Sequence, residues 1–547
     1  MLRRYPFVFV FLVTALLICS AYYFHFPYNL RADTEADYLD SLRIFRVHVQ
    51  EPPVQKPNGW LLSVSLPAYG QQALLYLRTD STQVAPVMGD ILLVRTRITR
   101  SHALFKGDFD YGNYLRLQHK VGIGYVHPQQ WQVVGHMPIR TLRAYAATVQ
   151  HSLALRFVDA GLHDQPLALM SAIILGERDA LDSELRQSFA VAGAAHVLAV
   201  SGLHTGIIYF VIASLLTCFG LRRPLYEQRI RRVLLSVAII IIMWAYAFVT
   251  GLSPSVMRAV LMLTIVQIGW MCRRQAVSVN TLAAAACICL WADPLCLFNV
   301  SFQLSFAAVL GILLFGRYMN SVWRVRNRAQ RFVRDLFTIS IAAIIGTLPV
   351  TLYYFGQVSR YFLLTNILII PAAYILVILG VLTLLLAHTI VGAWLAIVLQ
   401  LLSSLLCDFV QWIEHLPYAT LQLTVTPWMV VCLVMAIVFC YLRIRQQRIV
   451  WFVPAAAAVA LFCMLHVYDT RQSFNEHALA FRGRTLYYNH GGTTEQYKLD
   501  SSCTFFCFDG EEYAYAPYIS LRKRQALEQY CLEKHILLRT TDDTHTQ

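Results

Sequence analysis

Residues 196–206 read HVLAVSGLHTG and place imidazole and hydroxyl groups inside an otherwise apolar run. On a helix, Ser201, His204 and Thr205 would share roughly one face. A serine beside a histidine is the smallest set of residues that could supply the nucleophile and the general base of a hydrolase. That chemistry also needs a carboxylate that orients the histidine and donors that hold an oxyanion, and neither accompanies the motif. An intramembrane hydrolase is therefore the least favoured function.

The same polar groups have two other interpretations. Hydroxyl side chains in apolar segments commonly form hydrogen bonds between helices, which favours a packing role for Ser201 and Thr205. Ionisable groups within membrane segments are rare and usually face the protein interior or a water-filled path. For His196 and His204 the sequence therefore favours a polar, functional cavity.

Small and helix-breaking residues lie close to these polar groups. Gly202 and Gly206 are four residues apart, a spacing that lets the backbone of a second helix approach closely. Gly251 and Pro254 belong to the helix-breaking run TGLSPS at 250–255. We expect these four residues to serve helix packing.

Arg258 follows that break, early in the apolar stretch 255–272. An arginine at this position should reach the membrane interface or face an aqueous path. Its planar guanidinium suits a phosphate group. Phosphate guidance and a structural ion pair are equally favoured. Gln303 is a further candidate for lining an aqueous path through the membrane. Its position near the end of a span, like those of Asp293 and Asn366, is nevertheless more typical of hydrogen bonds between helices.

The overall composition indicates the environment of these residues. Of 547 residues, 57% are hydrophobic and only 14% are charged, whereas soluble domains carry about 25% charged residues. The chain is therefore expected to be a membrane protein. Its formal net charge is +14, an excess that basic cytoplasmic loops would explain and that a polyanionic partner would also suit.

Apolar stretches long enough to cross a bilayer recur along the whole chain. The predicted fold is a polytopic α-helical membrane protein with about eleven transmembrane helices. These stretches are 5–24, 196–219, 233–249, 255–272, 278–292, 300–316, 335–353, 362–387, 391–410, 428–442 and 449–466.

The connections between these stretches differ in charge. The connections at 221–232, 273–274, 316–334 and 443–448 are rich in arginine. Those at 250–254, 293–299, 354–361 and 411–427 contain a single lysine or arginine, Arg360. Because basic loops stay in the cytoplasm, the N-terminus should be cytoplasmic. Residues 1–24 are expected to remain as an anchor, since no small-residue cleavage site follows them.

Two extracytoplasmic parts follow from this topology, residues 25–137 and a short soluble C-terminal region, 467–547. Residues 25–137 hold short β-rich segments, and positions 94, 96 and 98 alternate with polar neighbours as in a half-buried strand. With one helix late in the strand order, we expect a small OB-like Greek-key barrel. The candidates for binding single-stranded nucleic acid in this barrel are Arg95, Arg97, Arg100, Tyr76 and Trp131. The two aromatic residues would suit a small core equally well.

Residues 138–195 contain apolar arms that are too short and interrupted to span. A charged break at 176–179, which includes Arg178, separates two arms. Irregular backbone at membrane depth is tolerated only against protein or a water-filled cavity. This pattern favours a re-entrant or interfacial hairpin at the mouth of the path, and the alternative is an amphipathic helix pair on the surface.

Several runs, taken in order, resemble the ComEC family of competence proteins. They are SAIILGERDALDSELRQSFAVAGAAHVLAVSGLHTG (171–206), TGLSPSVMRAVLM (250–262), DPLCLFNVSFQLSFAAVLG (293–311), GTLPVTLYYFGQVS (346–359), NILIIP (366–371) and, at the end of the barrel, GDFDYGNYLRLQHKVG (107–122). The resemblance covers about residues 30–466. It implies that residues 196–466 form an inner-membrane channel that carries single-stranded DNA into the cytoplasm during natural transformation.

The resemblance also implies partners. They are single-stranded DNA, membrane lipid, an extracytoplasmic DNA receptor and cytoplasmic single-strand-binding or motor proteins; the sequence does not indicate an oligomeric state. Many family members end in a metallo-β-lactamase-like domain with an HxHxDH motif, which this sequence lacks, and it has no Walker A loop either. We therefore expect no catalytic residue, metal or cofactor in this chain, and a separate nuclease.

Two further points stay open at this stage. A small-molecule or ion transporter is the alternative to a DNA channel, but it would typically show inverted repeats with matching broken helices, and none is evident. In the C-terminal region, Cys503, Cys507 and Cys531 suit either a disulfide or a buried thiol cluster.

Overall fold

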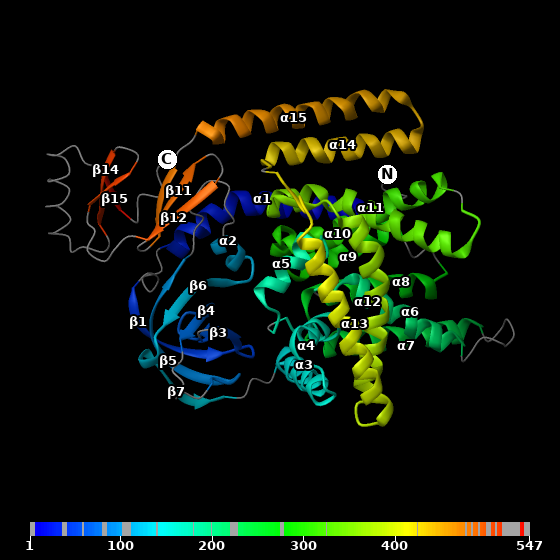
Figure 1. The fold of residues 1–547 in the computed structure, drawn as a ribbon, viewed down its shortest axis with the longest axis horizontal. Helices are drawn as coiled ribbons and strands as arrows, with labels where there is room; N and C mark the ends of the chain where they lie inside the picture. The colour runs from blue at the N-terminus through cyan, green and yellow to red at the C-terminus, as the bar shows by residue number, and fades with distance from the viewer. Residues whose placement is uncertain are drawn as a thin grey trace.

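The computed structural model places a β-barrel beside a large helical region (Figure 1). The residues it describes are 6–34, 41–56, 59–78, 85–100, 111–137, 141–178, 180–198, 200–218, 228–273, 278–323, 325–423, 425–475, 478–482, 485–490, 493–498, 505–508, 511–516 and 537–540. In the view of Figure 1 the barrel and the C-terminal strands lie at the left, and the helical region extends to the right.

Strands between residues 42 and 136 form the barrel. They are β1 (Leu42–Val49), β2 (Val54–Lys56), β3 (Gly59–Leu66), β4 (Gln71–Arg78), β5 (Asp90–Thr99), β6 (Lys120–Val126) and β7 (Trp131–His136). The order β1-β3-β4-β6-β5 closes because β5 also pairs with β1, while β2 and β7 extend the sheet. All of these pairings are antiparallel except that of β4 with β6. This is a closed five-stranded Greek-key barrel, so the OB-like prediction is confirmed.

The interior of the barrel is apolar. On β5, Val94, Thr96 and Ile98 are buried, and the intervening Arg95 is exposed, as the alternation predicts. Between β5 and β6 the described residues contain one helix, α2 (Tyr111–Arg116), which lies late in the strand order as expected. The barrel therefore directs its arginines outward.

Each of the eleven predicted apolar stretches contains a helix. The helices outside the barrel are α1 (Pro6–Thr34), α3 (Leu142–Asp159), α4 (Asp164–Met170), α5 (Ser183–Val191), α6 (Gly202–Cys218), α7 (Gln228–Val249), α8 (Pro254–Met271), α9 (Val279–Ala292), α10 (Val300–Val322), α11 (Arg328–Phe355), α12 (Phe362–Leu385), α13 (Ile390–Glu414), α14 (Pro427–Gln446) and α15 (Phe452–Asn475). Among the described residues, eight helices are long and apolar enough to cross a membrane, and the apolar parts of α1, α6 and α9 are shorter. The chain is thus a polytopic helical membrane protein, whereas the count of eleven spans stays a prediction.

Most of the long helices run in similar directions in Figure 1, with α12 and α13 crossing them steeply. The α10–α11 and α14–α15 connections lie at the right, at the end away from the barrel. These connections belong to the arginine-rich segments 316–334 and 443–448. The described structure therefore separates the basic connections from the barrel.

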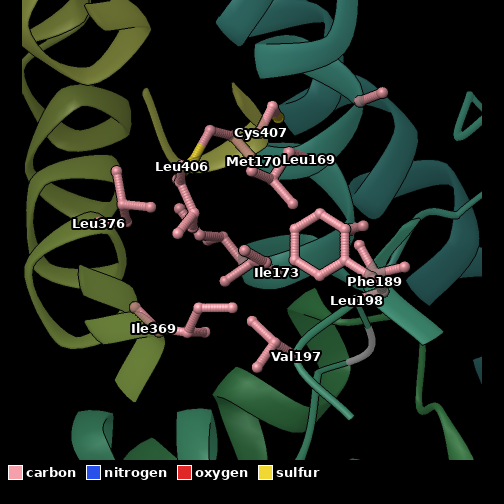
Figure 2. Close-up of a cluster of buried hydrophobic side chains, with 14 of the residues drawn as sticks. Leu169, Met170, Ile173, Phe189, Val197, Leu198, Ile369, Leu376, Leu406 and Cys407 are labelled. Carbon is pink, nitrogen blue, oxygen red and sulfur yellow. The ribbon is translucent and has the colours of Figure 1, made fainter. Parts of the chain in front are cut away.

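The interrupted segment at 164–191 lies in the core of the helical region. It contains α4, the π-helical turn η2 (Ser171–Leu175) and α5, and Gly176 ends η2 with a left-handed φ of 82°. Figure 2 shows how its apolar side chains pack against α12 and α13. The labelled residues of this cluster are Leu169, Met170, Ile173, Phe189, Val197, Leu198, Ile369, Leu376, Leu406 and Cys407. The first arm is buried throughout η2, whereas α5 buries Leu185 and Phe189 and keeps its polar face exposed, so the choice between a re-entrant hairpin and an amphipathic pair stays a prediction.

The C-terminal region contains strands that the sequence analysis did not predict. They are β10 (Ala478–Arg482), β11 (Thr485–His490), β12 (Thr493–Lys498), β13 (Phe505–Phe508), β14 (Glu511–Ala516) and β15 (Leu537–Thr540). They form two three-stranded sheets, and β14 pairs with β15 in parallel. The two alternatives for Cys503, Cys507 and Cys531, a disulfide or a buried thiol cluster, lie outside the described residues, since positions 503 and 531 and the side chain of Cys507 are not among them.

Candidate functional site

Ser201 caps the helix that carries the polar motif. Its Oγ accepts the Leu203 N–H at 3.2 Å, and the Nδ1 of His204 accepts the Ser201 N–H at 3.3 Å. These reciprocal bonds form a capping box in which a histidine takes the place usually held by glutamate or glutamine. The motif thus satisfies backbone donors that the start of α6 would otherwise leave unpaired.

The same geometry disfavours a serine hydrolase. The Ser201 Oγ lies 3.4 Å from the His204 Nδ1, beyond the usual range for a hydroxyl hydrogen bond. His204 is fully buried and Ser201 is half-buried, and a polar cavity around this histidine stays a prediction. Thr205 is also buried and donates to the Ser201 carbonyl of its own helix at 3.0 Å, rather than to a second helix.

His196 differs from His204 because it is exposed. It lies in the turn before α6, three residues after Gly193. Gly193 has a φ of 77°, and a Cβ there would lie 2.8 Å from the Ser359 Cβ. Only glycine suits this close approach, which packs the turn against the short strand β8 (Gln357–Ser359).

Arg258 joins α8 to α10. One of its terminal nitrogens donates to the Ser301 Oγ at 2.6 Å, to the Ser301 carbonyl at 3.1 Å and to the Ser305 Oγ at 3.1 Å. The side chain is only 9% exposed. Its position therefore lies within the helical region rather than at its rim.

The charge of Arg258 has no acidic counterpart in the described part of the chain. No ion pair links it to a described carboxylate, and its Nε is buried without a hydrogen-bond partner. Serine hydroxyls solvate a guanidinium but do not neutralise it, and an uncompensated buried charge is costly. Of the two interpretations left open by the sequence, the structural ion pair is not formed by any described residue.

The remaining path candidates have local roles or lie at the surface. Gln303 donates to the Leu297 carbonyl at 2.9 Å and so fixes the turn before α10. Arg178 is exposed at the break after η2, and its carbonyl accepts a bond from Arg186. Asn366, which the sequence placed among packing residues, is buried on α12 with its amide oxygen unpartnered.

The close helix contact predicted at Gly202 and Gly206 is not made there. A Cβ at Gly206 would meet no atom within 4 Å, and one at Gly202 would only touch Ala259 at 4.0 Å. The tight contact joins α10 to α11 instead, where a Cβ on Gly311 or Gly346 would overlap a backbone carbonyl of the opposite helix. Spacing alone could not distinguish these pairs, because the contact depends on which face each helix presents.

Of the two residues of the break that were predicted to serve packing, Gly251 makes a close contact, whereas Pro254 is exposed. Gly251 has a φ of 69°, and a Cβ there would overlap the side chain of Gln150 from α3. Gln150 in turn donates to the Leu175 carbonyl of η2 at 2.8 Å. Pro254 is the first residue of α8, so Arg258 follows one turn later. The break therefore lies between Arg258 and the Gln150 side chain that holds η2.

One of the barrel candidates is wrong. Trp131 is 8% exposed and packs in the barrel core, so it offers no face to DNA. Arg95 is exposed, and Arg97 and Arg100 are half-buried. The burial of Trp131 follows from its position as the first residue of β7, opposite Val94 of β5.

An outward-facing row connects the other barrel candidates. Tyr76 pairs with Leu61 on one side and with Tyr125 on the other, and the two tyrosine rings lie 6.0 Å apart. β5 pairs with β6 at Ile98 and Gly124, so Arg97 and Tyr125 lie on adjacent strands, each one residue beyond that pair. Tyr125, which is 63% exposed, was missed by the sequence analysis, although its place in the alternating VGIGYV strand indicated an outward side chain. Exposed rings beside a cation suit single-stranded nucleic acid.

Within the described residues, no group of three or more histidine, cysteine, aspartate or glutamate side chains is placed to hold a metal ion.

The sequence profile described as competence protein matches residues 173–448, just over half of the chain. The chain belongs to the competence protein family. The matched range includes the capped start of α6, Arg258 and the α10–α11 contact.

Curated relatives of this competence protein match over part of their length. The chain is 26% identical over 274 residues to ComE operon protein 3 of Bacillus subtilis (strain 168), covering 50% of this chain and 32% of the relative. It is 29% identical over 213 residues to Recombination protein 2 of Haemophilus influenzae, covering 37% and 26%. It is 28% identical over 193 residues to Competence protein ComA of Neisseria gonorrhoeae, covering 35% and 28%. The alignments thus span about a third or less of these relatives, and no solved structure was found to match the chain.

Proposed function

We propose that this competence protein carries single-stranded DNA across the plasma membrane into the cytoplasm during natural transformation. Membership of the competence family and the set of apolar helices support transport across a membrane. The observation that carries the proposal is the position of Arg258, a buried cation without a described carboxylate partner.

The geometry of Arg258 suits a polyanion that passes through. The serines of α10 occupy one terminal nitrogen, and the Nε–H remains for another acceptor. A phosphate would supply both the missing negative charge and that acceptor, since guanidinium and phosphate form charge-assisted hydrogen bonds. A neutral residue at this position would pack as well but would not attract the strand.

The proposed topology gives the barrel a role at the outer face. With the N-terminus in the cytoplasm, the barrel and the C-terminal region lie outside, and the basic helix connections lie inside. The row of Tyr76, Tyr125 and Arg97 would then receive single-stranded DNA by base stacking and charge. A receptor outside, a separate nuclease and a single-strand-binding or motor protein inside are the expected partners.

Uptake of labelled DNA tests this function. A strain that lacks the gene would be complemented with the chain, and fluorescent DNA protected inside the cytoplasm would be counted per cell. We expect complementation to restore cytoplasmic DNA. A chain that reaches normal abundance in the membrane while labelled DNA stays outside would contradict the proposal.

A further inference from the structure

Tyr418 is an exposed aromatic residue with an unusual backbone. Its side chain is 79% exposed, and its φ of 55° lies in the left-handed region that bulky residues rarely adopt. Such a conformation persists only when the surrounding structure imposes it, and it is frequent at ligand-binding sites. The residue lies between α13 and β9 (Thr420–Gln422).

The chain is fixed on both sides of Tyr418. The Tyr361 hydroxyl donates to the Pro417 carbonyl at 3.0 Å, and the Arg360 N–H donates to the Ala419 carbonyl at 2.9 Å. Immediately beyond, β8 and β9 pair with Ser359 opposite Thr420. The ring is therefore held outward by a rigid frame rather than by a slack loop.

Arg360 lies over the Tyr418 ring, with its guanidinium carbon 5.7 Å from the ring centroid. The arginine is itself exposed. It is also the single lysine or arginine in the four short connections predicted to lie outside the membrane, which otherwise carry no positive charge. A cation and an aromatic face are thus presented together at one point.

Arg360 and Tyr418 lie close to the turn before α6 that contains Gly193 and His196. Ser359, the residue before Arg360, is the one that Gly193 approaches closely, and Gly193 lies three residues before the exposed His196. The close approach of Gly193 to Ser359 therefore places the pair next to the turn that precedes the polar motif.

We propose that Tyr418 and Arg360 form a docking platform for single-stranded DNA on the outer face of the helical region. A base stacks on the Tyr418 ring, and the adjacent phosphate binds the Arg360 guanidinium. The inference rests on the proposed transport function and adds a contact point between the barrel and the interior. Stacking tolerates every base, which suits a transporter that must accept any sequence.

Two other roles fit the geometry less well. A purely structural clasp would bury the ring, whereas most of this ring is accessible. An interfacial tyrosine that only meets lipid headgroups needs neither a left-handed backbone nor anchors on both sides. Both roles predict that DNA binding is independent of the pair.

Oligonucleotide binding by the full chain tests the platform. The protein would be placed in nanodiscs of neutral phosphatidylcholine, and the dissociation constant of a fluorescent single-stranded oligonucleotide would be measured at several salt concentrations. Tyr418→Leu should weaken binding roughly tenfold, because one base–aromatic stack is lost, while Tyr418→Phe should stay near the parent. Arg360→Gln should weaken binding and lower the slope of log K against log salt by about 0.7, the value for one phosphate contact on a single strand. Trp394→Leu and Arg448→Gln, which change an exposed aromatic and an exposed arginine elsewhere, serve as controls.

The outcomes separate this inference from the function on which it rests. If Tyr418→Leu and Arg360→Gln bind the oligonucleotide as tightly as the parent chain does, the platform is overturned and the proposed function is not. If these variants instead lose binding to vesicles that contain anionic lipid, and keep DNA binding, the pair is a lipid contact and the platform is refuted. A parent chain that binds no single-stranded DNA would overturn both the platform and the proposed function.

Discussion

The barrel and the helical region distribute their polar residues in opposite ways. In the barrel, Val94 and Ile98 are buried and Arg95 is exposed. In the helical region, Arg258 and His204 are buried, while large apolar side chains cover much of the outside. The first arrangement suits water as the solvent, and the second suits lipid.

This difference decides which residues carry functional information. An exposed arginine on a water-facing barrel is ordinary, so Arg95 alone indicates little. A buried arginine in a lipid-facing helix has a large desolvation cost and therefore points to a ligand or a partner. The largest functional signal thus comes from the interior of the helical region, and from the surface only where aromatic rings and cations coincide.

The largest effect expected from a single change is the loss of Trp131 in the barrel. Trp131→Ala should reduce the free energy of unfolding of the barrel by roughly 3–5 kcal/mol, because it leaves a cavity in the core. Arg95→Gln should change it by less than about 0.5 kcal/mol, since that side chain is exposed. Proteolysis of the barrel in the full chain at increasing urea would measure both. Equal resistance of the two variants would contradict the assignment of Trp131 to the core.

The next effect concerns the helix contact. Gly346→Leu should destabilise the helical region by about 1–3 kcal/mol or more, because its side chain would overlap the backbone of α10. Gly206→Leu should leave the abundance near normal, since the space beside Gly206 is open. Immunoblots of membranes and thermal unfolding in detergent would compare them. A greater loss for Gly206→Leu would restore the contact that the sequence first suggested.

A smaller effect is expected at the outer surface of the barrel. Tyr125→Ala should weaken binding of single-stranded DNA by roughly 1–3 kcal/mol if one base stacks there. Its exposure means that stability should change by less than about 0.5 kcal/mol. Val133→Ala, at another exposed position of the barrel, is the matched control. Unchanged affinity for Tyr125→Ala would remove the tyrosine row from the DNA path.

The smallest effect is a dependence on pH. Burial lowers the pKa of Lys120 at the start of β6, and nearby Glu51 opposes the shift. The unfolded chain then holds this proton more tightly, so stability should rise slightly as the pH increases through the lowered pKa toward the ordinary value of 10.5. Lys120→Met should abolish that rise. Unfolding curves of both proteins at alkaline pH would show the difference, and parallel pH profiles would refute it.

Much of the fold follows from local patterns, and the site follows only in part. The alternation around Val94 predicts a barrel strand, and the apolar runs predict the helices, because both patterns reflect burial of one side or of a whole segment. The capping box at Ser201 has a short-range signature, yet histidine replaces the usual acidic residue, which concealed it. Contacts between distant segments carry no such pattern. The approach of Gly346 to α10 and the stacking of Arg360 on Tyr418 depend on how the helices are arranged in three dimensions.

Measuring DNA uptake by Arg258 variants tests the account most directly. Arg258→Gln, Arg258→Lys and the control Arg448→Gln would be expressed in the deletion strain, and cytoplasmic DNA would be divided by the amount of protein in the membrane. We predict that Arg258→Gln lowers this ratio roughly tenfold, as expected when a charged hydrogen bond is lost, while Arg258→Lys keeps part of it. Arg448→Gln should match the parent. Normal uptake per molecule by Arg258→Gln at normal abundance would contradict the account, because the buried charge would then play no part in moving DNA.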